Sequence, residues 1–221
     1  CKLNMINFKF NKIKDKIAFY ILDHGFVRAI YPNLYSIDGQ MFRSSQPSQR
    51  QLESLKKKIG IKTIINLRGE NGLVAYKFEK ETCERIGLKL INFRVYSRNP
   101  PKYEEIKNLE TLFKSIEYPA LMHCKSGSDR TGVVAALYRV LHLKESVEIA
   151  RSKELHWKYG HIKKSHTGVL DYFFDQYLFE NKSNPQPFLD WAENYDHISL
   201  KHRFRTSGWM NFLVDKVLRR E

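Results

Sequence analysis

The stretch Met122–Gly132, MHCKSGSDRTG, has one cysteine and one arginine with five residues between them, most of them small and polar. The apolar run PALMHC that ends at Cys124 predicts a buried strand, and the run that starts at Arg130 predicts a helix. The loop between them must therefore curl around the start of a helix. Backbone N–H groups without partners in a first helical turn, together with the helix dipole, make such a loop a binding site for anions.

A cysteine at the start of this loop should ionise readily, because the field that attracts an anion also stabilises a thiolate. Helix N-termini and nearby cations lower a cysteine pKa from about 8.5 to about 3.5–7.5. Gly127 lets the backbone turn its amides inward, and Arg130 can hold two phosphate oxygens in a fork that lysine cannot reproduce. We therefore expect Cys124 to be a nucleophile beneath a bound phosphate, which is also held by Lys125, Ser126 and Ser128.

Outward from this loop, strand and helix patterns alternate along the chain. The predicted strands are 40–45, 61–67, 88–95 and 119–124. The predicted helices are 46–60, with Ser48 as cap and Gly60 as end, then 73–87, 99–116 and 130–143, the last with Val133, Leu137, Val140 and Leu141 on one face. This order predicts an α/β fold with a central, mostly parallel sheet of four to five strands flanked by helices, followed by extra C-terminal helices.

The sequence suggests three parts. Residues 1–35 form a basic amphipathic segment, residues 36–182 form the main domain, and residues 183–221 contain a linker, SNPQP, and a C-terminal amphipathic helix. That last helix has the composition to lie on an anionic membrane, or it could pack on the protein's own core.

The chain is strongly basic, with 38 Lys and Arg against 24 Asp and Glu and a formal net charge of +14. Long-range attraction therefore favours anionic partners. The three cysteines are too few and too scattered for a disulfide framework, which favours a reducing, cytoplasmic location. Cys83, in the middle of a predicted helix, is expected to be a core thiol. The three histidines of HWKYGHIKKSH match no zinc motif, and we expect no metal.

The signature His-Cys-x5-Arg-Thr-Gly resembles that of the cysteine-dependent protein tyrosine phosphatase superfamily, in particular its compact bacterial dual-specificity branch. The resemblance extends to MFRSSQPSQRQLESLKKKIGIKTIINLRGE and covers about residues 35–180. It implies that Cys124 attacks phosphorus and forms a cysteinyl-phosphate, while Arg130 holds the equatorial oxygens. It also implies that His123 orients the loop, that the Thr131 hydroxyl stabilises the thiolate, and that no cofactor is needed.

Family members usually carry a general-acid aspartate on an upstream loop, but the corresponding stretch here, RVYSRNPPKYEE, has none. Asp129 is the leading replacement, because a bound phosphate would raise the pKa of a nearby carboxyl group, as an acid near neutral pH requires. Glu104 and Glu105 are the alternatives, although two glutamates in a first helical turn could simply complement the helix dipole.

Three cations could recognise the rest of the substrate. Lys125 follows the nucleophile, Arg98 lies in the loop where the acid was expected, and Arg68 follows a buried strand at its carboxyl end, where α/β sheets place their sites. Each of them could equally be a solvated surface charge.

The leading expectation is a phosphomonoesterase that acts on phosphotyrosine or phosphoserine/threonine proteins. The alternative is a phospholipid-headgroup phosphatase, for example one acting on phosphatidylglycerophosphate, with peripheral contact to the anionic inner membrane. The net charge, Lys125 and the C-terminal helix favour this alternative. An RNA 5′-phosphatase would share the Cys-x5-Arg loop, but no RNA-binding module is recognised, so a nucleic-acid partner is not expected. A non-catalytic phosphate-binding module is favoured only by the missing upstream aspartate.

Overall fold

The computed structural model of the chain describes residues 32–70 and 74–206. Two compact units are present in this part. The first contains the described residues up to Val95 together with Ile116–Thr131, and the second contains Tyr96–Ser115 and the residues from Gly132 onward. Most of the predicted N-terminal segment and the predicted C-terminal amphipathic helix lie outside the described residues, so the three-part division of the chain stays a prediction.

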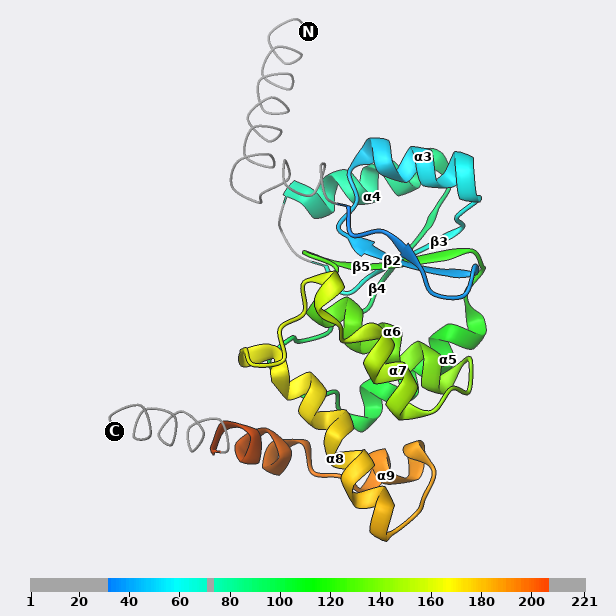
Figure 1. Cartoon of the computed structure of the whole chain (residues 1–221). Coiled ribbons are helices and arrows are strands. Elements are labelled where there is room, and N and C mark those ends of the chain that lie inside the picture. The colour runs from blue at the N-terminus through cyan, green and yellow to red at the C-terminus, as the bar shows by residue number, and fades with distance from the viewer. Residues whose placement is uncertain (1–31, 71–73, 207–221) are drawn as a thin grey trace, which may run out of the picture. The chain divides into compact units, whose positions relative to one another are not determined.

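The first unit is built on a five-stranded sheet with the order β1-β2-β5-β3-β4 (Figure 1). Its strands are β1 (Tyr35–Ser36), β2 (Met41–Ser45), β3 (Thr63–Asn66), β4 (Lys89–Asn92) and β5 (Ala120–Cys124). Strand β1 pairs antiparallel with β2, and all other neighbours are parallel. The predicted α/β fold with a mostly parallel sheet is confirmed, while the short antiparallel edge strand β1 was not predicted.

Helices α3 (Gln49–Ile59) and α4 (Val74–Ile86) pack together on one face of this sheet (Figure 1). As predicted, Ser48 caps α3: its hydroxyl accepts from the Gln51 N–H, and the Gln51 side chain accepts from the Ser48 N–H. Gly60 ends the helix in the left-handed conformation, with φ of 75°. The core between helices and sheet consists of Leu52, Leu55, Ile61, Ile64, Cys83, Leu88 and Leu121.

The central strands β3 and β5 are buried along their whole length. Parallel strands that are buried on both faces are rich in apolar residues, which explains Ile64 and Ile65 in β3 and the run from Ala120 to Met122 in β5. In the ladder, Ser45 of β2 pairs with Cys124, and Asn66 of β3 pairs with His123. The carboxyl ends of three parallel strands therefore meet around Cys124, at the sheet edge where α/β folds bind ligands.

The second unit is helical, with α5 (Tyr103–Ser115), α7 (Val147–Glu154), α8 (Val169–Ser183) and α9 (Phe188–Asn194). Helix α6 (Asp129–Leu141) starts in the first unit and continues into the second, and a further helix begins at residue 197. Helix α5 starts four residues later than predicted, because a residue that precedes a proline avoids the helical conformation, and Pro100 and Pro101 stand next to each other.

Helix α9 was not predicted. It packs on α8 through an aromatic cluster that contains Phe173, Tyr177, Phe188, Trp191 and Tyr195. The SNPQP stretch is therefore a short connection between two packed helices.

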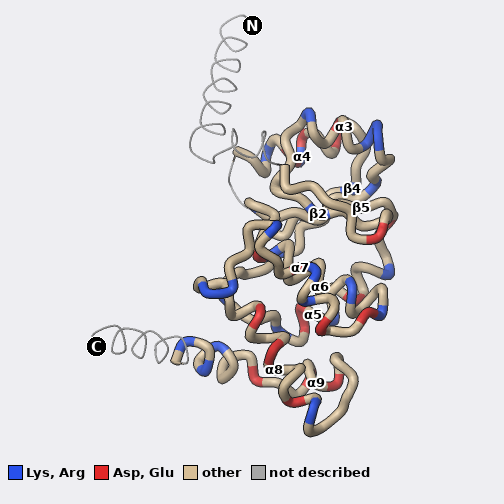
Figure 2. Tube along the Cα trace, viewed as in Figure 1, with Lys and Arg blue, Asp and Glu red and all other residues tan. Residues whose placement is uncertain are grey.

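Lysine and arginine residues are spread along the chain of both units rather than gathered on one element (Figure 2). None of the helices within residues 32–70 and 74–206 has the length and apolarity needed to cross a membrane.

Candidate active site

The loop between β5 and α6 consists of residues 125–128, and it turns sharply at Gly127, where φ is 76°. A Cβ atom at this position would lie 2.7 Å from the carbonyl carbon of Ser44 and from the amide nitrogen of Ser45. Both the positive φ and the close approach to β2 therefore require glycine, as the sequence predicted. We call residues 125–128 the phosphate loop.

The Cys124 side chain is buried at the base of this loop, with 2% of its surface exposed, and its sulfur accepts a hydrogen bond from the Gly127 N–H at 3.2 Å. Burial by itself raises the pKa of the thiol. The Arg130 charge, the Thr131 side chain and the backbone N–H groups of Thr131 and Gly127 act in the opposite direction and hold the pKa of Cys124 below its ordinary value. The site therefore favours a thiolate, the nucleophilic form of cysteine.

Asp129 and Arg130 form the first turn of α6 and are partly exposed. No carboxylate in the described part of the chain forms an ion pair with Arg130, so its guanidinium can receive an anion. Around the same loop, Lys125 is partly exposed, Ser126 is exposed, and Ser128 and Thr131 are buried. The structure thus brings together the residues that the motif predicted.

His123 is fully buried, and its Nε2 lies 2.5 Å from Oε1 of Glu79 on α4. Its Nδ1 lies 3.4 Å from the carbonyl oxygen of Cys124, and its role in orienting the loop stays a prediction. The second oxygen of Glu79 accepts from Nε2 of Gln46 at 3.1 Å. One oxygen of this buried carboxylate thus accepts a hydrogen bond, and the other lies close to the ring of His123, the residue that precedes the nucleophile.

The sequence analysis missed Glu79, although a signal for it exists. Glu79 lies four residues after Ala75 and four before Cys83, and all three are buried on the same face of α4. A carboxylate on an apolar helix face needs a buried partner. That partner, His123, is distant in sequence and is visible only in the fold.

Arg68, a predicted substrate-binding cation, is 8% exposed and donates a hydrogen bond from Nη1 to Oε1 of Gln46. The turn that carries it is shaped by Asn66, whose side chain accepts from the Arg68 N–H at 2.9 Å and donates to the Gly69 carbonyl at 3.1 Å. Through Gln46, Arg68 is connected to the Glu79–His123 pair. A direct contact between Arg68 and substrate stays a prediction.

Arg98, Glu104 and Glu105 belong to the second unit, so their proximity to Cys124 also stays a prediction. Arg98 and Glu104 are exposed. The Glu105 side chain accepts a hydrogen bond from the Lys102 N–H at 2.9 Å and so caps the start of α5, which fits the structural role considered for it.

A second buried cation, Arg43 on β2, was also missed. Its side chain is fully buried and donates from Nη2 to the carbonyl oxygens of Gly127 and Ser128, at 2.7 and 3.4 Å. An arginine inside a short strand that is otherwise apolar or small is a signal, because a buried guanidinium needs acceptors.

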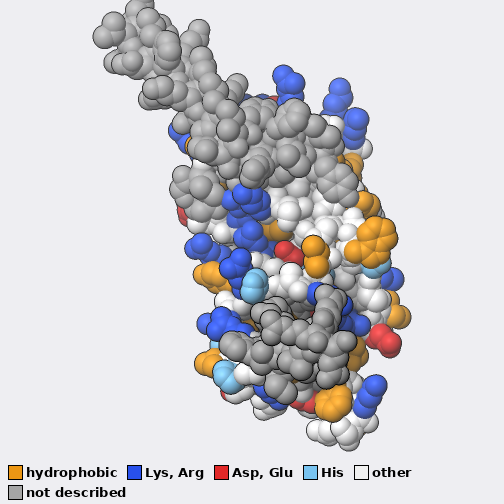
Figure 3. Space-filling model, turned by 60° about the vertical axis from the view of Figure 1, so that its left-hand side comes forward, with side chains coloured by type: hydrophobic (Ala, Val, Ile, Leu, Met, Phe, Trp, Pro, Cys, Tyr) orange, Lys and Arg blue, Asp and Glu red, His pale blue; other side chains and the backbone are white. Residues whose placement is uncertain are grey.

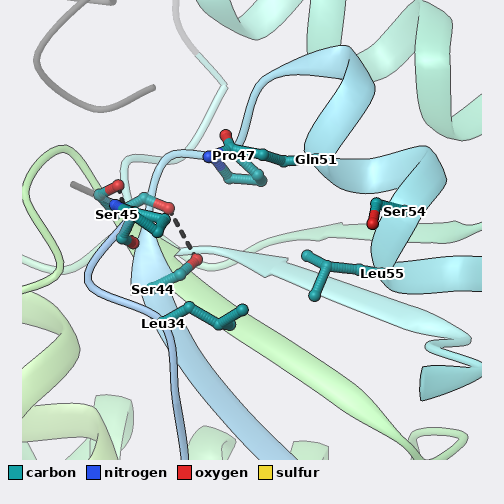
Figure 4. Close-up of a pocket in the computed structure, with 8 residues that line it drawn as sticks. Leu34, Ser44, Ser45, Pro47, Gln51, Ser54 and Leu55 are labelled. Carbon is teal, nitrogen blue, oxygen red and sulfur yellow. Dashed lines mark hydrogen bonds between the residues drawn. The ribbon is translucent and has the colours of Figure 1, made fainter. Parts of the chain in front are cut away.

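A pocket of about 120 Å³ lies between the carboxyl end of β2 and α3 (Figure 4). Its walls carry no charged side chain and include Leu34, Ser44, Ser45, Pro47, Gln51 and Leu55. Ser44 and Ser45 thus contact both this pocket and Gly127. Because its lining contains neither a cysteine nor a cationic side chain, this pocket is not a candidate for the phosphate site.

Cys83 and His161, one of the histidines of the HWKYGHIKKSH segment, are both buried within their own units. Cys83 is 1% exposed in the core, as predicted, and burial, followed by the charges of Glu79 and Glu84, raises the pKa of its thiol to about 12. His161 is buried and lies 2.6 Å from a carboxylate oxygen of Asp171 on α8. Within the described ranges, no three His, Cys, Asp or Glu side chains gather in a group that could hold a metal ion.

Comparison with known protein families agrees with this geometry. The family model described as "DSP-PTPase phosphatase fused to NAD+ Kinase" matches residues 35–167, which is more than half of the chain. The chain belongs to this family of DSP-PTPase phosphatases. The family predicted from the Cys-x5-Arg signature is thereby confirmed.

Among curated proteins, this phosphatase-family chain is similar to the dual specificity protein phosphatase TpbA of Pseudomonas aeruginosa strain UCBPP-PA14. The two are 24% identical over 110 residues, which cover 49% of this chain and 47% of TpbA. The chain spans about half the length of the curated relatives it matches.

Solved structures that share the fold include the following two. A Cys-to-Ser variant of P. aeruginosa TpbA in complex with pTyr has a TM-score of 0.53 at 16% identity, covering 72% of this chain and 87% of that one. Tk-PTP in its active form has a TM-score of 0.51 at 18% identity, covering 66% and 99%. At these identities the likeness shows the fold alone, which is that of a dual-specificity phosphatase.

Proposed function

We propose that this protein is a phosphomonoesterase that works through a cysteinyl-phosphate intermediate on Cys124. The placement of Cys124 carries the proposal: its sulfur accepts from the Gly127 N–H at 3.2 Å at the base of the phosphate loop, and although burial raises its pKa, the Arg130 charge and the Thr131 and Gly127 donors lower it below its ordinary value. The anion site formed by the phosphate loop and Arg130 lies directly beside this thiolate, which is the arrangement that nucleophilic attack on a phosphate requires.

In the first step, the Cys124 thiolate attacks phosphorus, the S–P bond forms, and the P–O bond to the leaving group breaks. The leaving oxygen takes a proton from a general acid. In the second step, water attacks phosphorus and gives a proton to the same group, the S–P bond breaks, and inorganic phosphate and the thiolate are released. Arg130 and the loop N–H groups stabilise the charge that develops on the equatorial oxygens, and Thr131 stabilises the thiolate.

For the general acid we favour Asp129, since it directly follows the phosphate loop and starts α6 beside Arg130. Glu104 is the alternative, while Glu105 already caps α5. Asp129→Asn should slow hydrolysis of an alkyl phosphate far more than hydrolysis of p-nitrophenyl phosphate. The alcohol is a poor leaving group and needs a proton, whereas p-nitrophenolate leaves without one. Full activity of Asp129→Asn on both substrates would assign the role elsewhere, and Glu104→Gln would then be tested in the same pair of assays.

For the substrate class we favour phosphorylated proteins, with phosphotyrosine as the first choice. The similar TpbA is named a dual specificity protein phosphatase, and its Cys-to-Ser variant was crystallised with pTyr. In this reading Lys125, Arg68 and Arg98 contact acidic groups near the phosphorylated residue, and the protein acts in the cytoplasm.

A phospholipid-headgroup phosphatase is the second candidate, and the formal net charge of +14 favours it. On the face shown in Figure 3, basic side chains are more frequent than acidic ones and lie beside hydrophobic groups. Such a surface would attract an anionic bilayer.

The deciding experiment measures phosphate release from a phosphotyrosine peptide and from phosphatidylglycerophosphate in mixed micelles, with Cys124→Ser as the blank. We expect faster Cys124-dependent release from the peptide. Faster release from the lipid would assign the second function. No Cys124-dependent release from either substrate would contradict the proposed activity and favour a phosphate-binding module.

A further inference from the structure

All four carbonyl oxygens of the phosphate loop are held by one short part of the chain, residues 33–46. The Gln46 N–H donates to the Lys125 carbonyl at 3.3 Å, and the Asn33 side chain donates from Nδ2 to the Ser126 carbonyl at 2.9 Å. Arg43 Nη2 donates to the carbonyls of Gly127 and Ser128, at 2.7 and 3.4 Å. Two side chains, Asn33 and Arg43, therefore hold three of the four carbonyls.

This pattern decides where the N–H groups of the loop point. In a trans peptide the C=O and the next N–H point in opposite directions. When the carbonyls of residues 125–128 face residues 33–46, the N–H groups of residues 126–129 must face the other side. The Gly127 N–H follows this rule, because it donates to the Cys124 sulfur at 3.2 Å. The anion side of the loop is thus set by what binds its opposite side.

Residues 33–46, which hold the loop, are themselves fixed by hydrogen bonds and burial. The Pro32 carbonyl accepts from both the N–H and the hydroxyl of Ser45, at 2.9 and 3.0 Å, which ties the chain beside Asn33 to the end of β2. Asn33 has φ of 47° and is 3% exposed, and Arg43 is fully buried in β2. Side chains held in this way lose little further freedom when they bind the loop, so the loop is ordered before any ligand arrives.

We propose that Arg43 and Asn33 are positioning residues, which hold the phosphate loop with its N–H groups toward the anion and toward the Cys124 sulfur. In this role they act through the loop carbonyls that they hold and not by contact with the substrate. The guanidinium of Arg43 also places a buried positive charge behind the loop, which favours an anion in front of it. This inference rests on the proposed function for its meaning in catalysis, but its test can be read without turnover.

Two variants test the hydrogen bonds by removing the side-chain donors of Arg43 and Asn33. Arg43→Met keeps a long side chain in β2 and removes both hydrogen bonds to the loop. Asn33→Gly removes the donor to Ser126, while glycine accepts the positive φ. The matched control is Arg85→Met, which removes a guanidinium of the same unit whose partner is Glu53 at 2.6 Å on the exposed surface.

The first measurement is the rate of Cys124 alkylation by iodoacetate as a function of pH, followed on the Cys124 peptide by mass spectrometry. We expect the midpoint to rise by about one pH unit in Arg43→Met and by less in Asn33→Gly, because the loop N–H groups no longer face the sulfur. The second measurement is the affinity for inorganic phosphate, which should fall roughly tenfold in Arg43→Met. The third measurement is kcat/KM with p-nitrophenyl phosphate, which should fall about 10- to 100-fold in Arg43→Met. Arg85→Met should leave all three unchanged.

A purely structural role would lower the melting temperature of both variants without moving the alkylation midpoint or the phosphate affinity of the folded protein, and that result would overturn the inference. If Arg43→Met shows no cooperative thermal transition, Asn33→Gly decides by the same two measurements. If the parent protein releases no phosphate but the midpoint still moves, the proposed function fails and the positioning role stands.

Discussion

Cys124 and Cys83 are both buried in the first unit, yet the pKa values of their thiols are shifted in opposite directions. The pKa of Cys124 is held below its ordinary value, whereas that of Cys83 is raised to about 12. Burial raises the pKa in both cases, so burial cannot explain the difference. The neighbours of each sulfur decide whether a buried cysteine is a nucleophile or a core residue.

The backbone around each sulfur explains the contrast. Cys83 lies within α4, where backbone N–H groups are used by the helix itself, and its charged neighbours are the carboxylates of Glu79 and Glu84. Cys124 lies at the junction of a strand and a helix, where the backbone N–H groups of Gly127 and Thr131 act on its sulfur, and its charged neighbour is Arg130. The surroundings of Cys83 disfavour a negative charge on its sulfur, whereas those of Cys124 favour one.

The largest effect is expected from exchanging one sulfur for oxygen. Cys124→Ser should lower the rate of phosphate release by at least about 10⁴-fold, because a hydroxyl does not ionise in this site and the covalent step is lost. Cys83→Ser is the matched control, and the folded variant should keep activity within about twofold. Rates are measured with p-nitrophenyl phosphate. Equal losses in the two variants would show that the opposite ionisation of the cysteines has no catalytic meaning.

A smaller effect is expected from the glycine that turns the loop toward Cys124. Gly127→Ala places a methyl group 2.7 Å from the backbone of β2, so the loop must shift, and kcat/KM should fall roughly 100-fold. Gly60→Ala is the control: φ there is 75°, similar to Gly127, but no atom lies within 4 Å of the added Cβ. It should cost only about 1 kcal/mol of unfolding free energy and leave kinetics unchanged. Similar kinetic losses in both variants would assign the effect to φ rather than to the contact with β2.

The smallest effect concerns Cys83 and appears only at alkaline pH. Because its folded pKa is raised from 9.0 to about 12, its contribution to stability is complete below pH 9 and is lost as the pH rises toward 12. The unfolded state then gains up to about 1.4 kcal/mol per pH unit by ionising. Cys83→Ala lacks this loss, so its unfolding free energy in urea should fall less than that of the parent protein between about pH 9 and pH 11. Parallel pH curves for the two proteins would contradict the raised pKa.

The parts of the site that could be predicted are those that are local in sequence. His123, Cys124, Gly127, Arg130 and Thr131 lie within nine residues, and a strand followed by a helix start is enough to place them around one anion. Glu79, Gln46, Arg43 and Asn33 could not be placed in this way, because they reach the loop only after β2 and α4 pack beside β5.

The fold shows the same division. The strand and helix order was predictable from apolar runs, a capping serine and an end glycine. In contrast, α6 was predicted to have one apolar face, whereas residues 131–139 are all buried. A helix that is apolar on every side is surrounded by other elements, and periodicity alone does not reveal those neighbours. Helix α9 was missed for a similar reason, since its aromatic residues are organised by α8 rather than by their own spacing.

By itself, the sequence determined the make-up of the candidate site: a cysteine, a glycine and an arginine at fixed spacing, between a buried strand and a helix start. These features act over one turn of backbone, where covalent geometry leaves few alternatives. The tertiary structure alone decided how that loop is held. The buried partners of His123 and of the four loop carbonyls come from elements up to 93 residues away, because a buried polar group takes whichever partner the packing of distant elements brings within hydrogen-bond distance.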